Sequence, residues 1–425
     1  MPPKKKSAAL PQNQDPNETV VPTTEPSSVA ATPTAKQDPE EERNKKKARI
    51  FELAKARGFN LKLGSELEEF EYVPIGLPNF DTKGGACRGR FIVMFGPAGS
   101  TKTTLVYRMI AAFQKKFPDQ SCLLISPERR NSPSWMATQG VSLDDLLILE
   151  DAEALEDYCE AALRLIKTGS ISFVAVDTVS MMMPRGYLSK EDKPDVNLMD
   201  KELVALDARK IGQWIRMTNG PIFSTNTACV LVSQARTHGI GSRHAYIDLS
   251  GGHMQRHMAN QIWQMTPMTS ESDAVYKLID TGEGKKVKVC TSFKVKALLK
   301  KDTGPNTGRI AYLDFRPGVG FDDALSVTNS GVFYGIVTKP SAAIYSWTDS
   351  QGVVQNFHGK PKVIEYFQAN SPEKDRLAEM ILKAYHDSKG TKEDETPVEG
   401  EWVDNDEIRS DEDAEAGEEA EGSPD

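Results

Sequence analysis

The chain has 425 residues and a formal net charge of −9, enough for one large hydrophobic core and a small satellite domain once its polar ends are set aside. No apolar run approaches the roughly 18 residues that a membrane span needs, and no apolar segment follows the opening MPPKKK. Five widely spaced cysteines without a C-x-x-C pair exclude a disulfide framework and a structural zinc site. These observations exclude secreted and membrane-spanning classes, and we expect a cytoplasmic protein.

The two ends of the chain differ in composition from the body between them. Residues 1–40 hold eight prolines and no apolar periodicity, so we predict a disordered arm. Residues 388–425 are predicted to form an acidic disordered tail, because residues 401–425 carry twelve Asp or Glu against one Arg, a net charge of −11. Outside residues 401–425 the chain has 51 basic and 49 acidic residues, so residues 401–425 account for the acidic pI.

Residues 41–72 are predicted to form a helix and a linker. Good helix formers run from Glu40 to Arg57, and Ile50 and Leu53 recur within the run at helical spacing. Because this apolar stripe is narrow, we expect the helix to pack on something outside its own core, such as a neighbouring subunit.

Residues 91–105, FIVMFGPAGSTKTTL, pass from an apolar β-rich run into a glycine-containing loop. The loop fits the phosphate-binding pattern G-x-x-x-x-G-K-[ST] at Gly96, Lys102 and Thr103. In such a loop backbone N–H groups surround phosphates at the start of a helix, Lys102 reaches the β- and γ-phosphates, and the Thr103 hydroxyl binds Mg²⁺. The predicted nucleotide-binding residues of the loop are Gly96, Pro97, Ala98, Gly99, Ser100, Thr101, Lys102, Thr103 and Thr104.

Position 101 departs from this pattern, because Thr101 stands where the second glycine is expected. A side chain there would point toward the β-phosphate, so nucleotide affinity or turnover could be altered although the loop persists. The alternative interpretation of the whole stretch is an ordinary glycine turn between a strand and a helix.

Three further apolar runs predict strands followed by polar side chains. They are SCLLIS, which precedes Glu128, ISFVAVD, which ends in Asp177, and CVLVSQ, which ends in Gln234. The carboxyl ends of such strands face the ligand, so Asp177 is expected at Mg²⁺ and the Gln234 amide can bond a phosphate oxygen. Helices are predicted between the strands, over residues 103–117, 144–167 and 201–217. This alternation predicts an α/β fold with a largely parallel sheet and helices on both faces.

The chain after Gln234 is less regular. Residues 235–250 are rich in Gly, His and Arg and lack periodicity, which predicts a long mobile loop with a functional role. The histidines around Gly251-Gly252, His238, His244, His253 and His257, raise a metal site as a competing interpretation, although no cysteine lies among them. Residues 287–298 and 309–315 are predicted to pair as a hairpin. From 321 to 387 we predict a small C-terminal α/β domain, with a hairpin over 343–356 and helices over 361–368 and 373–386.

From Ile75 to His386, about three quarters of the chain, the order and spacing of these pieces resemble the RecA family of recombinases. The most specific part is GPAGSTKTTL, which is similar to the family loop GPESSGKTTL. The resemblance implies a RecA-like P-loop NTPase core over residues 73–320 that uses ATP and Mg²⁺. It also implies that Glu128 is the general base, that Trp135 stacks on adenine, that Asp177 is the Walker B aspartate, and that Gln234 senses the γ-phosphate. The alternative for Trp135 is a half-buried loop aromatic.

The resemblance further implies contacts with DNA and with a neighbouring subunit. The implied DNA-binding residues are Arg185, Arg209, Arg216, Arg236, Arg243, Gly251 and Gly252. Arg209 and Arg216 are seven residues apart, two turns of one helix, so we expect both on one helix face. Lys300 and Lys301 lie where the family sends two lysines to the neighbour's ATP, but the family spaces them by one residue. In a strand, adjacent side chains face opposite sides unless the chain bulges.

We therefore expect a DNA-dependent ATPase that forms helical filaments on single-stranded DNA and promotes homologous pairing and strand exchange with double-stranded DNA. Filaments follow from a head-to-tail interface that does not close. Two alternatives stay open: a hexameric helicase built on the same core, and a nucleotide-binding protein that coats DNA and hydrolyses ATP poorly. The acidic tail either solvates the protein or competes with DNA for the basic loops.

Overall fold

The computed structural model describes residues 39–67, 69–187, 206–238, 246–249, 253–280 and 286–388. The chain divides between Glu69 and Phe70 into two units, which are described separately below. Within the described ranges no helix combines the length and the apolar character needed to cross a membrane.

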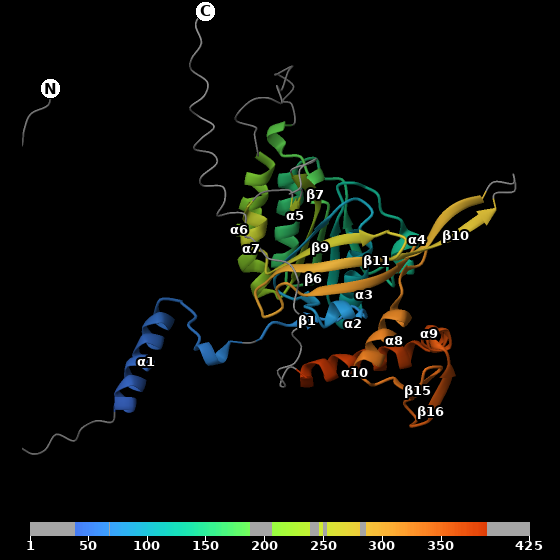
Figure 1. Cartoon of the computed structure of the whole chain (residues 1–425). Helices are drawn as coiled ribbons and strands as arrows, with labels where there is room; N and C mark the ends of the chain where they lie inside the picture. The colour runs from blue at the N-terminus through green and yellow to red at the C-terminus, as the bar shows by residue number, and fades with distance from the viewer. Residues whose placement is uncertain are drawn as a thin grey trace, which may run out of the picture. The chain divides into compact units, whose positions relative to one another are not determined.

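The first unit contains the predicted N-terminal helix, α1 (Pro39–Ala56), and a short 3₁₀ helix, η1 (Gly64–Glu66) (Figure 1). Three glutamates occupy the first turn of α1 and a lysine its last turn, so both ends complement the helix dipole. Two ion pairs join side chains four residues apart, Glu41 to Lys45 at 2.8 Å and Glu42 to Lys46 at 2.7 Å. The helix is therefore stabilised by local interactions along its own surface.

The second unit is organised around a mixed sheet that has eleven strands within the described residues. Along the main path its strands are β13 (Gly320–Phe321), β12 (Ile310–Arg316), β11 (Lys286–Asp302), β9 (Gln261–Met268), β3 (Phe91–Gly96), β7 (Ala228–His238), β6 (Ile171–Asp177), β4 (Ser121–Ile125) and β5 (Leu146–Leu149). The stretch from β9 to β5 is parallel throughout, whereas β11, β12 and β13 continue it antiparallel. The α/β fold with a largely parallel sheet, predicted from the sequence, is confirmed.

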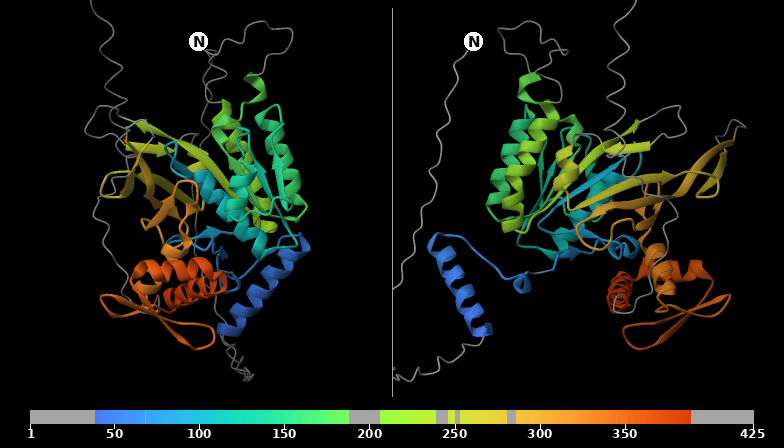
Figure 2. Two further views of the ribbon diagram at one scale, coloured as in Figure 1. Left: turned by 90° about the vertical axis from the view of Figure 1, so that its right-hand side faces the viewer. Right: turned by 60° about the vertical axis from the view of Figure 1, so that its left-hand side comes forward.

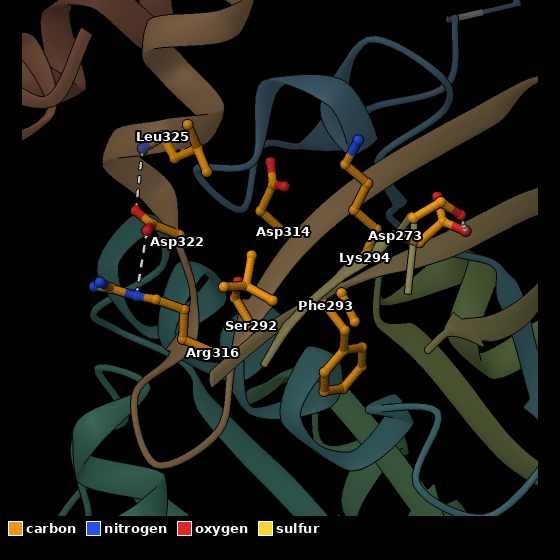
Figure 3. Close-up of a pocket in the computed structure, with 11 residues that line it drawn as sticks. Asp273, Ser292, Phe293, Lys294, Asp314, Arg316, Asp322 and Leu325 are labelled. Carbon is orange, nitrogen blue, oxygen red and sulfur yellow. Dashed lines mark hydrogen bonds and ion pairs between the residues drawn. The ribbon is translucent and has the colours of Figure 1, made fainter. Parts of the chain in front are cut away.

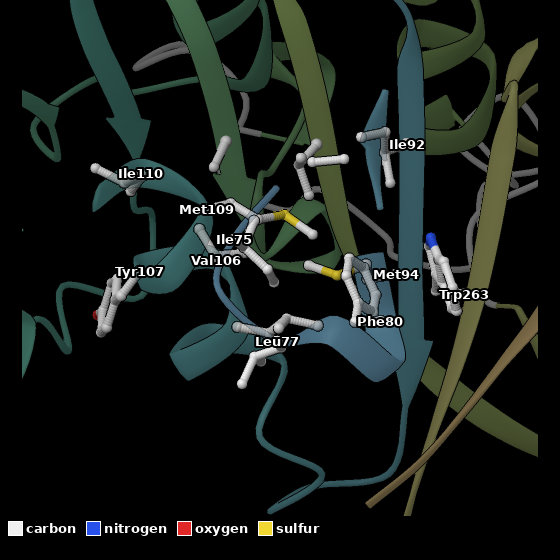
Figure 4. Packing of buried hydrophobic residues seen from close by; sticks show 14 of the residues in the cluster. Ile75, Leu77, Phe80, Ile92, Met94, Val106, Tyr107, Met109, Ile110 and Trp263 are labelled. Atoms are coloured by element: carbon white, nitrogen blue, oxygen red, sulfur yellow. The ribbon is translucent and has the colours of Figure 1, made fainter. Parts of the chain in front are cut away.

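Helices cover both faces of this sheet (Figures 1 and 2). Helix α3 (Lys102–Lys116) packs on one face, and α5 (Leu155–Lys167), α6 (Leu206–Ser224) and α7 (His253–Met258) lie over the other. Strand β3 is buried on both sides, because Ile92 and Met94 enter the α3 cluster while Phe91, Val93 and Phe95 enter the opposite one. Figure 4 shows Met94 beside Phe80 and Trp263 in the first cluster. These two layers fix β3, and with it the start of the phosphate loop.

Small elements complete this layer. Strands β1 (Tyr72–Val73) and β2 (Ala86–Cys87) pair antiparallel and enclose α2 (Pro78–Asp81), and α4 (Pro133–Thr138) follows β4. The Asp81 carboxylate accepts hydrogen bonds from the N–H groups of Ile75 at 2.9 Å and Leu77 at 3.0 Å. It therefore holds the chain that leads into the core in a tight turn.

Two predictions for the segments beside the core are wrong. The helix predicted over 144–167 is a strand followed by a shorter helix, because residues 146–149 pair parallel with β4 before α5 begins at Leu155. A short apolar run cannot be assigned from periodicity alone, and here a neighbouring strand edge decided it. The predicted long loop after Gln234 is partly β structure. Strand β7 continues to His238, and β8 (Tyr246–Leu249) pairs back on it antiparallel.

The hairpin predicted from 287–298 and 309–315 is confirmed as β11 and β12, paired from Phe293↔Phe315 to Leu298↔Ile310. Strand β11 is longer than predicted, since its first half pairs with β10 (Ala274–Asp280) to form a ribbon that extends away from the body (Figure 1). At the base of this ribbon lies a pocket of about 330 Å³, lined in part by Lys294, Asp314 and Arg316 (Figure 3). Burial raises the pKa of Asp314. None of the residues predicted to bind nucleotide or DNA lines this pocket.

The last described segment is a small α/β module with its own hydrophobic cluster around Trp347 and Phe367. Its elements are α8 (Asp323–Phe333), β14 (Thr338–Ser341), β15 (Ile344–Thr348), β16 (Val354–His358), α9 (Lys360–Ala369) and α10 (Ser371–Ser388). The hairpin and the two helices predicted here are confirmed. Asp323 joins the module to the core, because it lies 2.6 Å from Arg108 of α3 and 3.4 Å from Lys374 of α10. The domain boundary near residue 320 stays a prediction.

Candidate functional site

The predicted phosphate loop lies between the end of β3 and the start of α3. Gly99 and Thr101 have left-handed backbones, with φ of 72° and 61°. Gly96 is required by packing, since a Cβ atom there would come 2.2 Å from the carbonyl oxygen of Met265 on β9. Thr101 is the N-cap of α3 but makes no side-chain cap bond, and the first turn of α3, described throughout, has no acidic side chain. The helix therefore presents backbone N–H groups and the positive end of its dipole without an internal anion.

The Lys102 ammonium is held inside this loop. Its Nζ donates to the carbonyl oxygens of Gly96 and Pro97, both at 2.8 Å, and to the Ser100 hydroxyl at 3.0 Å. Burial lowers the pKa of Lys102, while the negative charges of Asp177 and Glu128 act in the opposite direction. These contacts place a cation at the centre of the loop, within the field of two carboxylates.

Thr103 and Asp177 form a pair of oxygen ligands next to the loop. The Thr103 hydroxyl donates to Oδ2 of Asp177 at 2.6 Å, although the two residues are 74 positions apart. Burial raises the pKa of Asp177 and the Glu128 charge adds to this effect, whereas the Thr103 hydrogen bond and Lys102 lower it. A hydroxyl and a carboxylate at this separation are hard oxygen donors of the kind that Mg²⁺ prefers. The residues present therefore fit a nucleotide phosphate with its magnesium ion.

The ends of β3 and β6 lie beside this pair, next to the residues of β7 where its parallel pairing stops. Gly96 of β3 lies opposite Gln234 of β7, and Val232 of β7 lies opposite Asp177 of β6. The Gln234 side chain is exposed, so its amide is free to meet a ligand bound at the loop. This edge is where ligands bind in doubly wound sheets.

Glu128 and Trp135 come from the segment between β4 and α5. Glu128 is mostly buried, and its Oε2 lies 3.6 Å from Nη1 of Arg130. Trp135 is half-buried on α4, and its indole N–H donates to the Thr104 hydroxyl at 3.4 Å. Glu128 follows β4, whose last residue Ile125 lies opposite Val176, next to Asp177, and Trp135 contacts Thr104 directly. Both predicted side chains thus lie near the phosphate loop.

The residues implied in DNA binding are less uniformly placed. Arg209 and Arg216 are both exposed on α6, and Arg236 is exposed on β7 opposite Asp248 of β8. Arg185 instead forms an ion pair with Asp157, and its backbone N–H donates to Glu156 at 2.9 Å. Arg243, Gly251 and Gly252 lie outside the described residues. The DNA-binding role of all these residues stays a prediction.

Lys300 and Lys301 occupy a β-bulge, because the pairing of β11 with β9 shifts register between Leu299 and Lys301. The two side chains have different surroundings. Lys301 donates to the backbone carbonyls of Arg256 at 2.7 Å and His257 at 2.9 Å, at the C-terminal end of α7. Lys300 lies 5.7 Å from the centre of the Phe95 ring, and burial lowers its pKa. Lys301 is thus engaged within its own chain, which leaves Lys300 as the better placed of the two for a neighbour.

Sequence reasoning missed two features near the site. Arg130 contacts the predicted base Glu128, and its only sequence signal is its position two residues later. Asp248 of β8 forms an ion pair with Arg256 of α7, which joins the β7–β8 hairpin to the helix that follows it. The two residues belong to different elements, a strand and a helix, so the periodicity of neither element marks the pair.

A family profile and individual known proteins similar to this chain point to the same family. The profile of one family, described as RecA N-terminal domain, matches residues 51–291, more than half of the chain. A protein named RecA from Paramagnetospirillum magneticum is 33% identical over 191 residues, which cover 44% of this chain and 50% of that protein. Proteins of the same name from Xanthomonas axonopodis pv. citri and Phytoplasma mali are 32% and 36% identical, over 45% and 36% of this chain and 56% and 42% of their own length. The chain spans about half the length of the curated relatives it matches.

Proposed function

Since this chain belongs to the RecA family, we propose that it is a DNA-dependent ATPase that forms helical filaments on single-stranded DNA and promotes homologous pairing and strand exchange. One observation carries the ATPase part of the proposal. The Thr103–Asp177 pair, the Lys102 ammonium and Gln234 lie around the N-terminus of α3, at the ends of β3 and β6 and beside β7. Such an arrangement suits a triphosphate with Mg²⁺.

ATP would supply the phosphoryl group whose loss resets the filament, and the chain's own side chains divide the work. The loop N–H groups and Lys102 bind the phosphates, Thr103 and Asp177 hold Mg²⁺, and Trp135 offers its ring to the adenine. Glu128 accepts the proton of the attacking water.

Gln234 supports a link between nucleotide and DNA. It lies level with Gly96 in β7, and two residues later the same strand carries exposed Arg236. An amide that bonds the terminal phosphate and changes partner on its loss would shift β7, and with it the basic segment that follows. DNA phosphates would be gripped there and on α6 by Arg209 and Arg216, without reading of sequence.

Filament growth is proposed from two features. Exposed apolar side chains, Ile50 and Leu53 on α1 among them, offer a surface for a neighbour, and Lys300 offers a cation to the neighbour's nucleotide. A head-to-tail interface that does not close generates a helical polymer.

The test is the Lys102→Ala variant, with Lys115→Ala on the same helix as the control, because Lys115 is exposed and pairs with Asp375. We expect Lys102→Ala to lose about a hundredfold or more in DNA-stimulated phosphate release, as expected for removing a phosphate-binding cation. It should also lose ATP-dependent filaments in negative-stain images, while Lys115→Ala keeps both. A Lys102→Ala variant that still coats DNA and exchanges strands in an ATP-dependent manner would contradict the proposal.

A second candidate function, a DNA-coating protein with slow hydrolysis, is favoured by the strained Thr101 in the loop. Phosphate release measured beside DNA coating separates the two, since full coating with negligible turnover indicates a binding protein. Negative-stain images also test a third possibility, a ring helicase, which would form closed rings in the absence of DNA.

A further inference from the structure

The loop between β4 and α4 carries two adjacent arginines whose side chains have different partners. Arg129 has a left-handed backbone, with φ of 53°, and its Nε donates to the carbonyl oxygen of Glu150 at 3.1 Å. Its Nη2 also lies 3.3 Å from the Asp151 carboxylate. Arg130 contacts a different group, because its Nη1 lies 3.6 Å from Oε2 of Glu128. The left-handed turn therefore separates a structural arginine from one that faces the predicted base.

The contact of Arg130 with Glu128 is loose. A separation of 3.6 Å is longer than a hydrogen bond, and the Arg130 side chain is 81% exposed whereas that of Glu128 is 22% exposed. Ion pairs of this kind stabilise a protein by only about 0–1 kcal/mol. The guanidinium can therefore leave Glu128 for a more strongly charged partner at little cost.

Such a partner would bind nearby. Glu128 follows the end of β4 by three residues, and the last residue of β4, Ile125, lies opposite Val176, which directly precedes Asp177. Glu128 therefore lies at the same edge of the sheet as the Thr103–Asp177 pair. Two other cations of this region have backbone partners, since Lys102 donates to three loop oxygens and Lys301 to two carbonyls of α7. Arg130 is an exposed cation, and it lies directly beside the predicted base.

We propose that Arg130 is a further phosphate-binding residue of the ATPase site, which holds Glu128 when no triphosphate is bound and moves to the terminal phosphate when one is. The inference rests on the proposed function. A guanidinium binds phosphate through two parallel N–H groups, and a terminal phosphate carries more charge than a carboxylate. Departure of Arg130 leaves the Glu128 carboxylate accessible to the attacking water.

The chemical step balances within this arrangement. The water oxygen forms a bond to the terminal phosphorus, and the bond from phosphorus to the bridging oxygen breaks with its electron pair left on ADP. Glu128 takes the water proton, and Arg130 stabilises the negative charge that spreads over the transferred group. One movement of one side chain thus frees the base and supplies the cation.

The test compares Arg130→Gln and Arg130→Lys with Arg129→Gln as the matched control. Binding of fluorescent ADP and of a non-hydrolysable ATP analogue is measured for each variant, together with kcat and KM for DNA-stimulated hydrolysis. Because a charge-assisted hydrogen bond is lost, we expect Arg130→Gln to bind the ATP analogue about tenfold more weakly, with ADP affinity unchanged, and to lose about tenfold or more in kcat. Arg130→Lys should recover part of the affinity for the ATP analogue and part of kcat. Arg129→Gln should leave the affinity for the ATP analogue, the affinity for ADP and kcat unchanged.

Two outcomes would overturn the inference. Arg130→Gln that matches Arg129→Gln in every parameter would show that the guanidinium does not reach the phosphate. Equal weakening of ADP and ATP-analogue binding would assign Arg130 a general structural role. In either case, loss of hydrolysis in Lys102→Ala would still support the proposed function. Absence of hydrolysis in the unaltered protein would contradict the proposed function, but the comparison of ADP and ATP-analogue binding would remain valid.

Discussion

At Thr101 the phosphate loop takes a left-handed backbone conformation that a β-branched side chain disfavours. Its hydroxyl is also buried without a hydrogen-bond partner among the described residues. Each feature costs on the order of 1–2 kcal/mol. Glycine would carry neither, although it loses more conformational entropy on folding, by about 0.5–1 kcal/mol.

We therefore expect Thr101→Gly to stabilise the protein by about 1 kcal/mol and to tighten or speed nucleotide use. Thr101→Ala is the control, because it removes the hydroxyl and keeps the left-handed cost of a Cβ atom. Urea unfolding and nucleotide titration measure the two effects. If glycine gives no gain over alanine in either measurement, backbone strain at this position is not the handicap.

Asp81 gives the unfolding free energy a distinct pH dependence. Burial raises its pKa to about 7, despite the backbone hydrogen bonds that it accepts. Between about pH 4 and pH 7 the folded state therefore holds a proton that the unfolded chain has released. Stability contributed by this group is present at low pH and is lost as the pH rises, with a slope of up to about 1.4 kcal/mol per pH unit.

We expect this component to disappear in Asp81→Asn, which cannot titrate. Urea unfolding of both proteins at pH 4.5, 6 and 7.5 yields the difference in unfolding free energy. Asn is expected to be the less stable protein at pH 4.5, since its NH₂ group faces one of the two donors, Ile75 and Leu77. The gap should narrow as the pH rises, and a constant gap would assign the pH dependence to other groups.

At the scale of elements, the bulge in β11 gives neighbouring lysines different surroundings. Lys301 caps the carbonyl end of α7, a favourable position for a cation, whereas Lys300 is half-buried beside Phe95. A helix as short as α7 depends on such contacts with the rest of the protein.

Lys301→Met is expected to lower the unfolding free energy by about 1–2 kcal/mol, because two charge-assisted hydrogen bonds are lost. Lys300→Met should change stability little and lower DNA-stimulated ATPase activity if Lys300 reaches a neighbouring subunit. Thermal or urea unfolding and phosphate release measured on both variants distinguish these roles. The reverse pattern would mean that Lys301 is the one that acts across the interface.

At the scale of the whole molecule, charge is divided between a nearly neutral body and an acidic C-terminal segment with a net charge of −11 over residues 401–425. Anionic side chains can compete with DNA phosphate for arginines, and salt weakens such competition.

We expect truncation after Ser388 to strengthen duplex DNA binding at low salt, with the gain shrinking as ionic strength rises toward about 0.5 M. A full-length variant with the acidic residues of 401–425 replaced by Asn and Gln serves as the control for length. It should behave like the truncated protein. Equal affinity of all three proteins across a salt titration would remove the competition.

The sequence by itself determined the strand, loop and helix around Gly96 and Lys102, together with the polar ends of the strands at Asp177 and Gln234. These features are encoded locally, by apolar runs of strand length and by residue types that phosphate binding requires. The family match over residues 51–291 is consistent with that local pattern.

Only the tertiary structure decided which segments pair and which side chains meet. It turned residues 146–149 into an edge strand beside β4, folded β8 back on β7, and bulged β11 so that Lys301 reaches α7. It also placed Arg130 against Glu128 and separated it from Arg129. The physical reason is that periodicity specifies the face of an element, whereas partners across a sheet or a loop are chosen by distant residues that no local pattern contains.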